Sequence, residues 1–107
     1  MGDNMNDKLY NLMNWPEIEA IVYAECENPG KILGEHITDK GLLIQVYMPF
    51  AKKVVLIKDE DSTSYTMEMV DENGFFAILL RGKKKIKYTL SITHQDGTVE
   101  EIIDPYM

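Results

Sequence analysis

The sequence has few of the residues from which active sites are usually built. It contains one cysteine, Cys26, and two histidines, His36 and His94, in 107 residues. A single cysteine excludes an internal disulfide, and the set lacks the four suitably spaced ligands of a structural zinc site. A Gly-rich phosphate loop, a nucleophile elbow and a His-Glu-x-x-His motif are also missing. The sequence therefore predicts no metal, no cofactor and no catalytic residue in this chain.

Positive charge and long hydrophobic runs are also scarce. There are 11 lysines and arginines against 18 acidic residues, a formal net charge of −7. This charge disfavours nucleic acid or an anionic membrane as a partner, and no apolar stretch approaches the ~20 residues that span a bilayer. The polar N-terminus lacks a signal-peptide pattern, and one free cysteine fits a reducing compartment. We expect a cytoplasmic protein with no nucleic-acid or membrane partner.

The one basic run extends from Arg81 to Lys87 and includes Lys83, Lys84 and Lys85. Such a run could bind phosphate groups. It falls between two strand-like segments in an acidic chain, however, and we interpret it as a solvated hairpin loop.

From Gly41 onward, apolar and polar residues alternate with a period of two. The alternating segments are 42–48, 64–69 and 86–93. This pattern predicts antiparallel strands with one face in water. Turn residues recur about every 8–12 residues, including Asn73-Gly74 and Asp96-Gly97, which is typical of a sandwich. The predicted fold class is all-β: an immunoglobulin-like β-sandwich with a short N-terminal helical segment.

The helical segment is predicted to begin near Pro16, which suits a first helical position. Ile18, Ile21 and Val22 follow at helical spacing, and the Asn28-Pro29-Gly30 stretch ends the pattern. Upstream, Leu9, Leu12 and Met13 favour one weaker helical turn. We therefore expect a flexible segment at 1–14, with residues 1–7 disordered, and a sandwich module at 15–107.

Residues 75–80 are apolar on both faces of the predicted strand. Phe75, Ala77 and Leu79 share one face, and a two-layer sandwich has a single core that only one face can enter. We predict that these three residues, with the segment Asp104-Pro105-Tyr106, form an interdomain surface. The alternative is that the N-terminal helix covers the second face. Asp-Pro-Tyr is poor material for closing a domain, so we expect it to lead into a further domain of a longer protein.

Aromatic residues are the remaining candidates for binding, because sandwich domains hold sugars on exposed rings. Tyr65 and Tyr88 lie on apolar faces and are expected in the core. Tyr47 falls on the polar face of its strand, and Trp15 precedes the helix, where it could pack as a staple. Trp15 and Tyr47 are therefore the candidate contacts for a weakly bound sugar.

Six short segments occur in a recognisable order, at 18–21, 28–36, 46–54, 74–76, 87–90 and 103–106. Together they resemble the first domain of bacterial 1,4-α-glucan (glycogen) branching enzymes. The resemblance implies a parent glycosyltransferase that cuts α-1,4 bonds and forms α-1,6 branches, with its catalytic carboxylates beyond Met107. It implies for this chain a non-catalytic role, which is to pack against the remaining domains and influence the length of the transferred chains.

Two other functions stay open at the level of sequence. One is a glucan-binding module, which requires exposed coplanar aromatic rings and for which Trp15 and Tyr47 are the candidate weak glucan contacts. The other is a free-standing protein-interaction domain.

Overall fold

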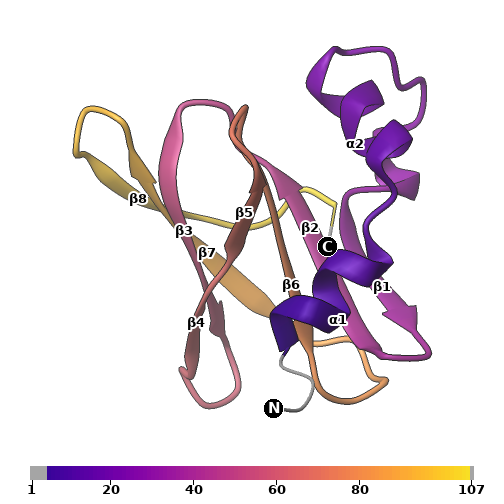
Figure 1. The fold of residues 1–107 in the computed structure, drawn as a ribbon. Coiled ribbons are helices and arrows are strands. Elements are labelled where there is room, and N and C mark those ends of the chain that lie inside the picture. Colours follow the sequence, from indigo (N-terminus) through magenta and orange to yellow (C-terminus); the bar gives the residue numbers. More distant parts are fainter. Residues whose placement is uncertain (1–4, 107) are drawn as a thin grey trace.

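The structure, a computed structural model, describes residues 5–106, with side chains from Lys8 onward (Figure 1). The N-terminal part contains helices α1 (Met5–Leu12) and α2 (Trp15–Val22) and a 3₁₀ turn at Pro29–Lys31. The strands that follow are β1 (Gly34–Thr38), β2 (Gly41–Tyr47), β3 (Ala51–Lys58), β4 (Ser64–Thr66), β5 (Glu68–Asp71), β6 (Phe75–Leu80), β7 (Tyr88–His94) and β8 (Val99–Ile102). Of the residues expected to be disordered at 1–7, residues 5–7 form the start of α1, and residues 1–4 lie outside the described part of the chain.

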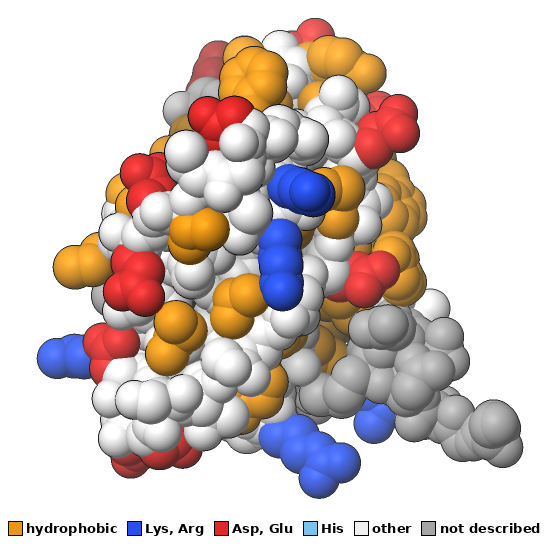
Figure 2. Space-filling view, turned by 90° about the vertical axis from the view of Figure 1, so that its left-hand side faces the viewer, with side chains coloured by type: hydrophobic (Ala, Val, Ile, Leu, Met, Phe, Trp, Pro, Cys, Tyr) orange, Lys and Arg blue, Asp and Glu red, His pale blue; other side chains and the backbone are white. Residues whose placement is uncertain are grey.

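The strands form two four-stranded antiparallel sheets. Sheet A has the order β1-β2-β6-β5, and sheet B has the order β4-β3-β7-β8. These orders correspond to the ABED and C′CFG sheets of immunoglobulin domains. The prediction of an immunoglobulin-like β-sandwich with a short N-terminal helical segment is therefore confirmed. Figure 2 views the molecule from the side of sheet B, where hydrophobic side chains alternate with polar and charged ones.

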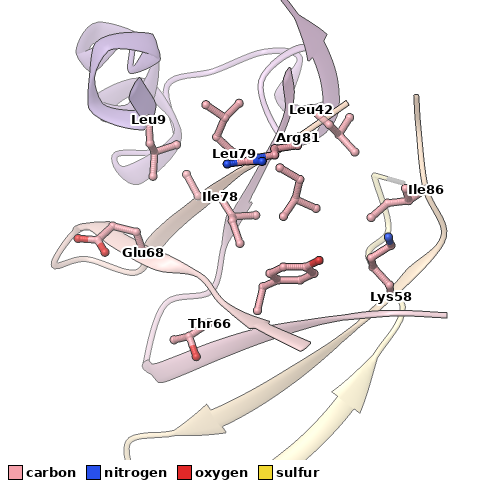
Figure 3. Close-up of a pocket in the computed structure, with 12 residues that line it drawn as sticks. Leu9, Leu42, Lys58, Thr66, Glu68, Ile78, Leu79, Arg81 and Ile86 are labelled. Carbon is pink, nitrogen blue, oxygen red and sulfur yellow. The ribbon is translucent and has the colours of Figure 1, made fainter. Parts of the chain in front are cut away.

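The segment predicted as one strand at 64–69 is two strands in different sheets. β4 pairs with β3 of sheet B, whereas β5 pairs with β6 of sheet A. Met67 lies at the crossing, where its N–H donates to the Val54 carbonyl and its side chain stays buried. The alternation continues through the crossing because Met67 remains in the core. Near this crossing, residues of both sheets and of α1 surround an open cleft (Figure 3).

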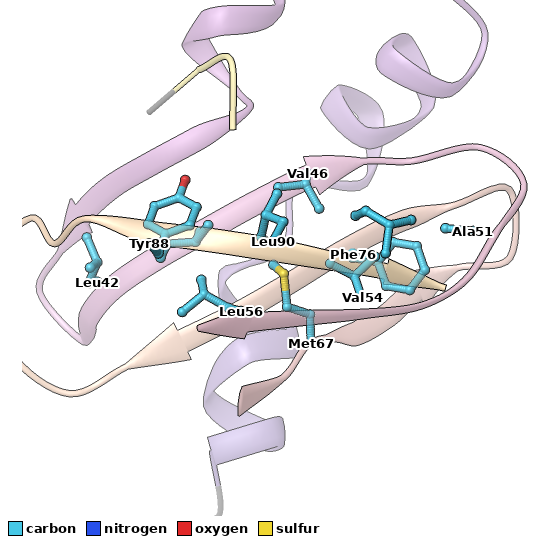
Figure 4. Close-up of a cluster of buried hydrophobic side chains, with 11 residues drawn as sticks. Leu42, Val46, Ala51, Val54, Leu56, Met67, Phe76, Tyr88 and Leu90 are labelled. Carbon is cyan, nitrogen blue, oxygen red and sulfur yellow. The ribbon is translucent and has the colours of Figure 1, made fainter. Parts of the chain in front are cut away.

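The main core lies between the two sheets (Figure 4). It is formed by the inward residues of strands β2, β3, β6 and β7 and by Met67. The fully buried side chains include Ile44, Leu56, Phe76 and Tyr88. Tyr88 is in the core as predicted, whereas Tyr65 packs at its margin and is only partly buried.

A second core lies on the outer face of sheet A, beneath the two helices. Leu9 of α1 and Ile18 of α2 are each 1% exposed there, and they belong to the same cluster as Phe75 and Leu79. The segment expected to be flexible at 1–14 therefore contains helix α1, which packs on the sheet through Leu9. The weak helical pattern was visible in the sequence, but the distant β6 residues that stabilise it were not.

Helix α2 begins where the sequence predicts. The side chain of Asn14 accepts a hydrogen bond from the Glu17 N–H at 3.2 Å, and Pro16 occupies the first turn. The helix ends at Val22, before the expected stop signal, because Ala24 takes the left-handed conformation with φ of 58°. In residues 5–106, the structure has no helix that is long and apolar enough to cross a membrane.

Candidate functional site

The three strand residues predicted at an interdomain surface are buried inside this chain. Phe75 and Ala77 are 0% exposed and Leu79 is 4% exposed. They lie beneath α1, α2 and the 29–33 segment, so the prediction of an interdomain surface at this face of β6 is wrong. The alternative, in which the N-terminal helical part covers the face, is the observed one. Burial of this apolar area stabilises the attachment of both helices.

The C-terminal part of the predicted surface divides into buried and exposed residues. Asp104 is buried, whereas Pro105 and Tyr106 are exposed. Asp104 Oδ2 accepts a short hydrogen bond from the Tyr88 hydroxyl at the start of β7. Its Oδ1 accepts from the Tyr106 N–H at 2.9 Å. A buried carboxylate with two donors thus holds the C-terminal segment against the sandwich.

Tyr88 contributes a buried hydroxyl to this arrangement. Burial, the hydrogen bond to Asp104, and the negative charges of Asp104 and Glu35 all raise its pKa above the ordinary value for tyrosine. Glu35 is itself nearly buried, and its Oε2 accepts from the Ile86 N–H at 2.8 Å. The hydroxyl therefore stays protonated and can donate to Asp104 at all ordinary pH values.

A close backbone approach also fixes the C-terminal segment. Gly34 has φ of 92°, and a Cβ atom at this position would lie 2.4 Å from the Tyr106 carbonyl oxygen. Only glycine fits such a conformation and such a contact without strain. A shallow hollow of about 250 Å³ adjoins this point and is lined by residues that include Tyr47, Cys26 and Tyr106. We call Pro105, Tyr106 and this hollow the exit surface.

The two aromatic residues predicted to contact glucan differ in their exposure to solvent and in their neighbours. Tyr47 is only partly exposed, because it packs at the margin of the second core and lines the hollow of the exit surface. Trp15 is 44% exposed and stacks on Tyr10, with ring centroids 6.4 Å apart and ring planes 26° apart. Tyr10 also donates from its hydroxyl to Glu68 Oε2 at 2.7 Å. The structure brings Trp15 together with Tyr10 and not with Tyr47.

The residues considered for metal binding lie apart. Among the residues that the structure describes, no group of three or more histidine, cysteine, aspartate or glutamate side chains could hold a metal ion. His36 Nε2 lies 3.2 Å from the Leu33 carbonyl oxygen, and His94 Nε2 lies 3.0 Å from Glu100 Oε1. Cys26 is a free, partly buried thiol. The two histidines thus each have a protein oxygen within hydrogen-bond distance.

Sequence reasoning placed Tyr88 in the core but missed its bond to Asp104, and it missed the roles of Gly34 and Tyr10. The Tyr88 bond was missed because Asp104 was predicted at an interdomain surface, whereas a carboxylate buried inside the domain requires donors. For Gly34 and Tyr10 the sequence carries no signal, since their partners are distant along the chain.

Comparison with known proteins decides the family. The family model described as "alpha-1,4-glucan branching enzyme GlgB, N-terminal domain" matches residues 14–106. The chain belongs to this family. The resemblance inferred from the six sequence segments is thereby confirmed.

The curated relatives are whole branching enzymes. The chain is 33% identical over 93 residues to the 1,4-alpha-glucan branching enzyme GlgB of Rhizobium meliloti (strain 1021), covering 85% of this chain and 12% of that protein. It is 30% identical over 95 residues to the enzyme of the same name from Paramagnetospirillum magneticum, covering 89% and 12%. The chain thus spans about an eighth of the length of these relatives.

A solved structure supports the fold alone. The chain resembles part of the pullulanase from Bacillus acidopullulyticus with a TM-score of 0.55 and 24% identity, over 69% of this chain and 10% of that one.

Proposed function

We propose that this chain serves as the non-catalytic N-terminal domain of a cytoplasmic glycogen branching enzyme. The match of residues 14–106 to the GlgB N-terminal family carries this proposal. Its relatives are branching enzymes of which the chain spans about an eighth, which supports a role as one part of such an enzyme, with the branching reaction placed in other parts. In this role the domain packs against the remaining domains and influences the length of the transferred glucan chains.

The exit surface is the proposed contact with the rest of the enzyme. Pro105 is exposed, and Tyr106 and Ile103 are 44% and 72% exposed, although all three are hydrophobic. Asp104 and Gly34 hold the backbone of this segment in one position. A fixed backbone that presents apolar side chains suits a packed junction better than a flexible linker. Phe75, Ala77 and Leu79 have no part in this contact.

A domain exchange tests the proposal. In the Rhizobium meliloti enzyme, the matching N-terminal segment is deleted or replaced by residues 14–106 of this chain. We expect the exchange to restore a chain-length profile, measured after debranching, that the deletion alters. An exchanged enzyme that folds but has the profile of the deletion would refute the proposed influence on chain length. Incubation of this chain alone with amylose is expected to give no new α-1,6 branches.

The exit surface can be tested in the same exchanged enzyme. Tyr106→Ala removes an exposed ring at the proposed junction, and Val99→Ala removes a hydrophobic group on β8 that is even more exposed, as a control. We expect Y106A to lower the midpoint of thermal unfolding of the enzyme, and V99A to leave it unchanged. Equal effects of the two variants would place the junction elsewhere.

The stacked Tyr10 and Trp15 rings favour a second candidate function, which is weak binding of α-glucan. A sugar ring can pack on an exposed indole, and Glu68 lies within hydrogen-bond distance of Tyr10. One exposed ring pair gives little contact area compared with a formed ligand site. We therefore rank this candidate below the structural role.

A further inference from the structure

The cleft at the open edge of the sandwich has the form of a ligand site. It has a volume of about 500 Å³ and lies between the two sheets near the β4–β5 crossing. Its walls include Tyr65, Ile78, Leu80 and Ile86, four side chains that pack against the main core but remain partly exposed. Figure 3 shows Ile78 and Ile86 on two sides of this space. Water in the cleft therefore contacts apolar surface that a ligand with a hydrocarbon chain would cover.

Two cationic side chains lie at the rim of the cleft. Lys58 of β3 and Arg81, which follows β6, both line it (Figure 3). They also line a second hollow of about 510 Å³, whose wall includes Lys84, Lys85 and Lys87. The rim of the cleft thus joins the basic run of the sequence. In a chain with a net charge of −7, this end concentrates positive charge.

Three of the acidic residues near the rim have partners of their own, whereas Glu60 lines only the second hollow and is exposed. Glu68 lines the cleft but accepts a hydrogen bond from Tyr10, and Asp59 Oδ1 accepts from the Thr89 hydroxyl at 3.0 Å. Asp61 lies 4.0 Å from Lys58 Nζ. Among the described residues, Arg81 forms no ion pair with a carboxylate. Its guanidinium can therefore bind an external anion through paired N–H groups.

We propose that the cleft binds a small single-chain aliphatic acid. The hydrocarbon chain packs against Ile78, Leu80 and Ile86, and the carboxylate binds at the rim near Arg81. The apolar wall and the cationic rim of the cleft favour this ligand over a glucan, because a glucan has neither a hydrocarbon chain nor a charge. The inference does not depend on the proposed role in branching.

Chemical-shift titration of the isotope-labelled chain with octanoate, below its micelle concentration, tests the proposal. We expect saturable shifts at the amides of Tyr65, Ile78–Leu80 and Ile86. Octanol lacks the charge and acetate lacks the hydrocarbon chain, so each should bind at least about tenfold more weakly. The proposal is wrong if octanoate gives no saturable shifts, if octanol binds equally well, or if acetate gives the same shifts.

One arginine variant and one lysine variant test where the carboxylate of the ligand binds. Arg81→Gln removes the rim guanidinium, whereas Lys83→Gln removes one charge from the same loop at a position outside both hollows. We expect R81Q to weaken octanoate binding about tenfold and K83Q to change it less than twofold. Equal losses in the two variants would indicate a diffuse charge effect and overturn the assignment. The amide spectrum without ligand shows independently that each variant is folded.

Discussion

The hydroxyl of Tyr88 links a strand in the core to the segment that follows β8. It donates to Asp104, and the same carboxylate binds the Tyr106 N–H. The bond joins groups that are both removed from water, so neither can exchange its partner for solvent. One side-chain pair therefore determines where the C-terminal segment lies on the domain.

Replacing Tyr88 by phenylalanine should destabilise the domain by about 1–3 kcal/mol, because Asp104 would lose a donor while remaining buried. Tyr65→Phe is the matched control, since Tyr65 is only partly buried and surface changes usually stay within about 0.5 kcal/mol. Urea unfolding followed by circular dichroism measures both. Equal stabilities of Y88F and Y65F would show that the Asp104 bond contributes nothing.

The raised pKa of Tyr88 also predicts a pH dependence at the alkaline side. The unfolded tyrosine loses its proton near pH 10, before the folded one does, so the stabilisation is complete below about pH 10 and is lost as pH rises further. The free energy of unfolding of the unaltered chain minus that of Y88F should therefore decrease between pH 8 and pH 11. The other titrating groups are present in both proteins, so their contributions cancel in this difference of unfolding free energies. A constant difference would contradict the burial of a protonated hydroxyl.

Gly34 and Gly97 offer a comparison of two glycines with nearly the same backbone conformation. Their φ angles are 92° and 90°, but a Cβ at Gly34 would meet the Tyr106 backbone, whereas Gly97 has open space. Gly97→Ala should cost about 1–2 kcal/mol from the left-handed conformation alone. Gly34→Ala should cost at least about 1 kcal/mol more, through overpacking. Thermal unfolding measures the difference in stability. Equal losses of stability would show that the Tyr106 backbone moves away from the added Cβ at no cost in free energy.

At the level of elements, α1 and α2 cover the outer face of sheet A, whereas the outer face of sheet B has no helix over it in the described residues. The residues of β6 are apolar on both faces for this reason, since each face enters a different core. A strand between two cores cannot show the one-sided alternation of its neighbours.

Truncation of one residue in α1 tests how firmly this helix is attached. Leu9→Ala should destabilise the domain by about 2–4 kcal/mol, because Leu9 is fully buried above β6. Lys8→Ala, at the neighbouring exposed position, should have little effect. Amide hydrogen exchange in Phe75–Leu80 should accelerate in L9A. Unchanged exchange and stability would mean that α1 is not needed to cover this face.

At the level of the whole molecule, acidic charge predominates, and most of the exposed aromatic rings in the described residues are not stacked on one another. The aromatic side chains that are more than a third exposed include Tyr10, Trp15, Tyr23, Phe50 and Tyr106. Only Tyr10 and Trp15 form a stacked pair in the described part of the chain. Such a surface gives few places where a sugar chain could pack.

Maltoheptaose should accordingly bind with a dissociation constant weaker than about 100 μM, or about −5.5 kcal/mol. Any shifts in an amide titration should centre on Trp15, and Trp15→Ala should abolish them. Tyr47→Phe serves as the control, since its ring is partly buried beside the exit surface. Saturation below 100 μM would favour a glucan-binding module over a structural domain.

Local patterns in the sequence determined much of the fold. Period-two alternation gives strands because successive side chains point to opposite faces, and it identified β2 and β7. Pro16 located the start of α2, because a helix leaves its first N–H groups unpaired. The ordered family segments identified the domain type, which the match over residues 14–106 confirms.

Contacts between distant segments decided the rest. Leu9 meets the Phe75 face, Tyr88 meets Asp104, and Gly34 meets Tyr106 only after the sheets have formed. The sequence therefore predicted that the second face of β6 needs cover, but not what covers it. It placed Tyr47 on the polar face of its strand, although that face carries the second core. Alternation specifies which residues share a face, whereas only tertiary packing decides whether a face meets water, a helix or another sheet.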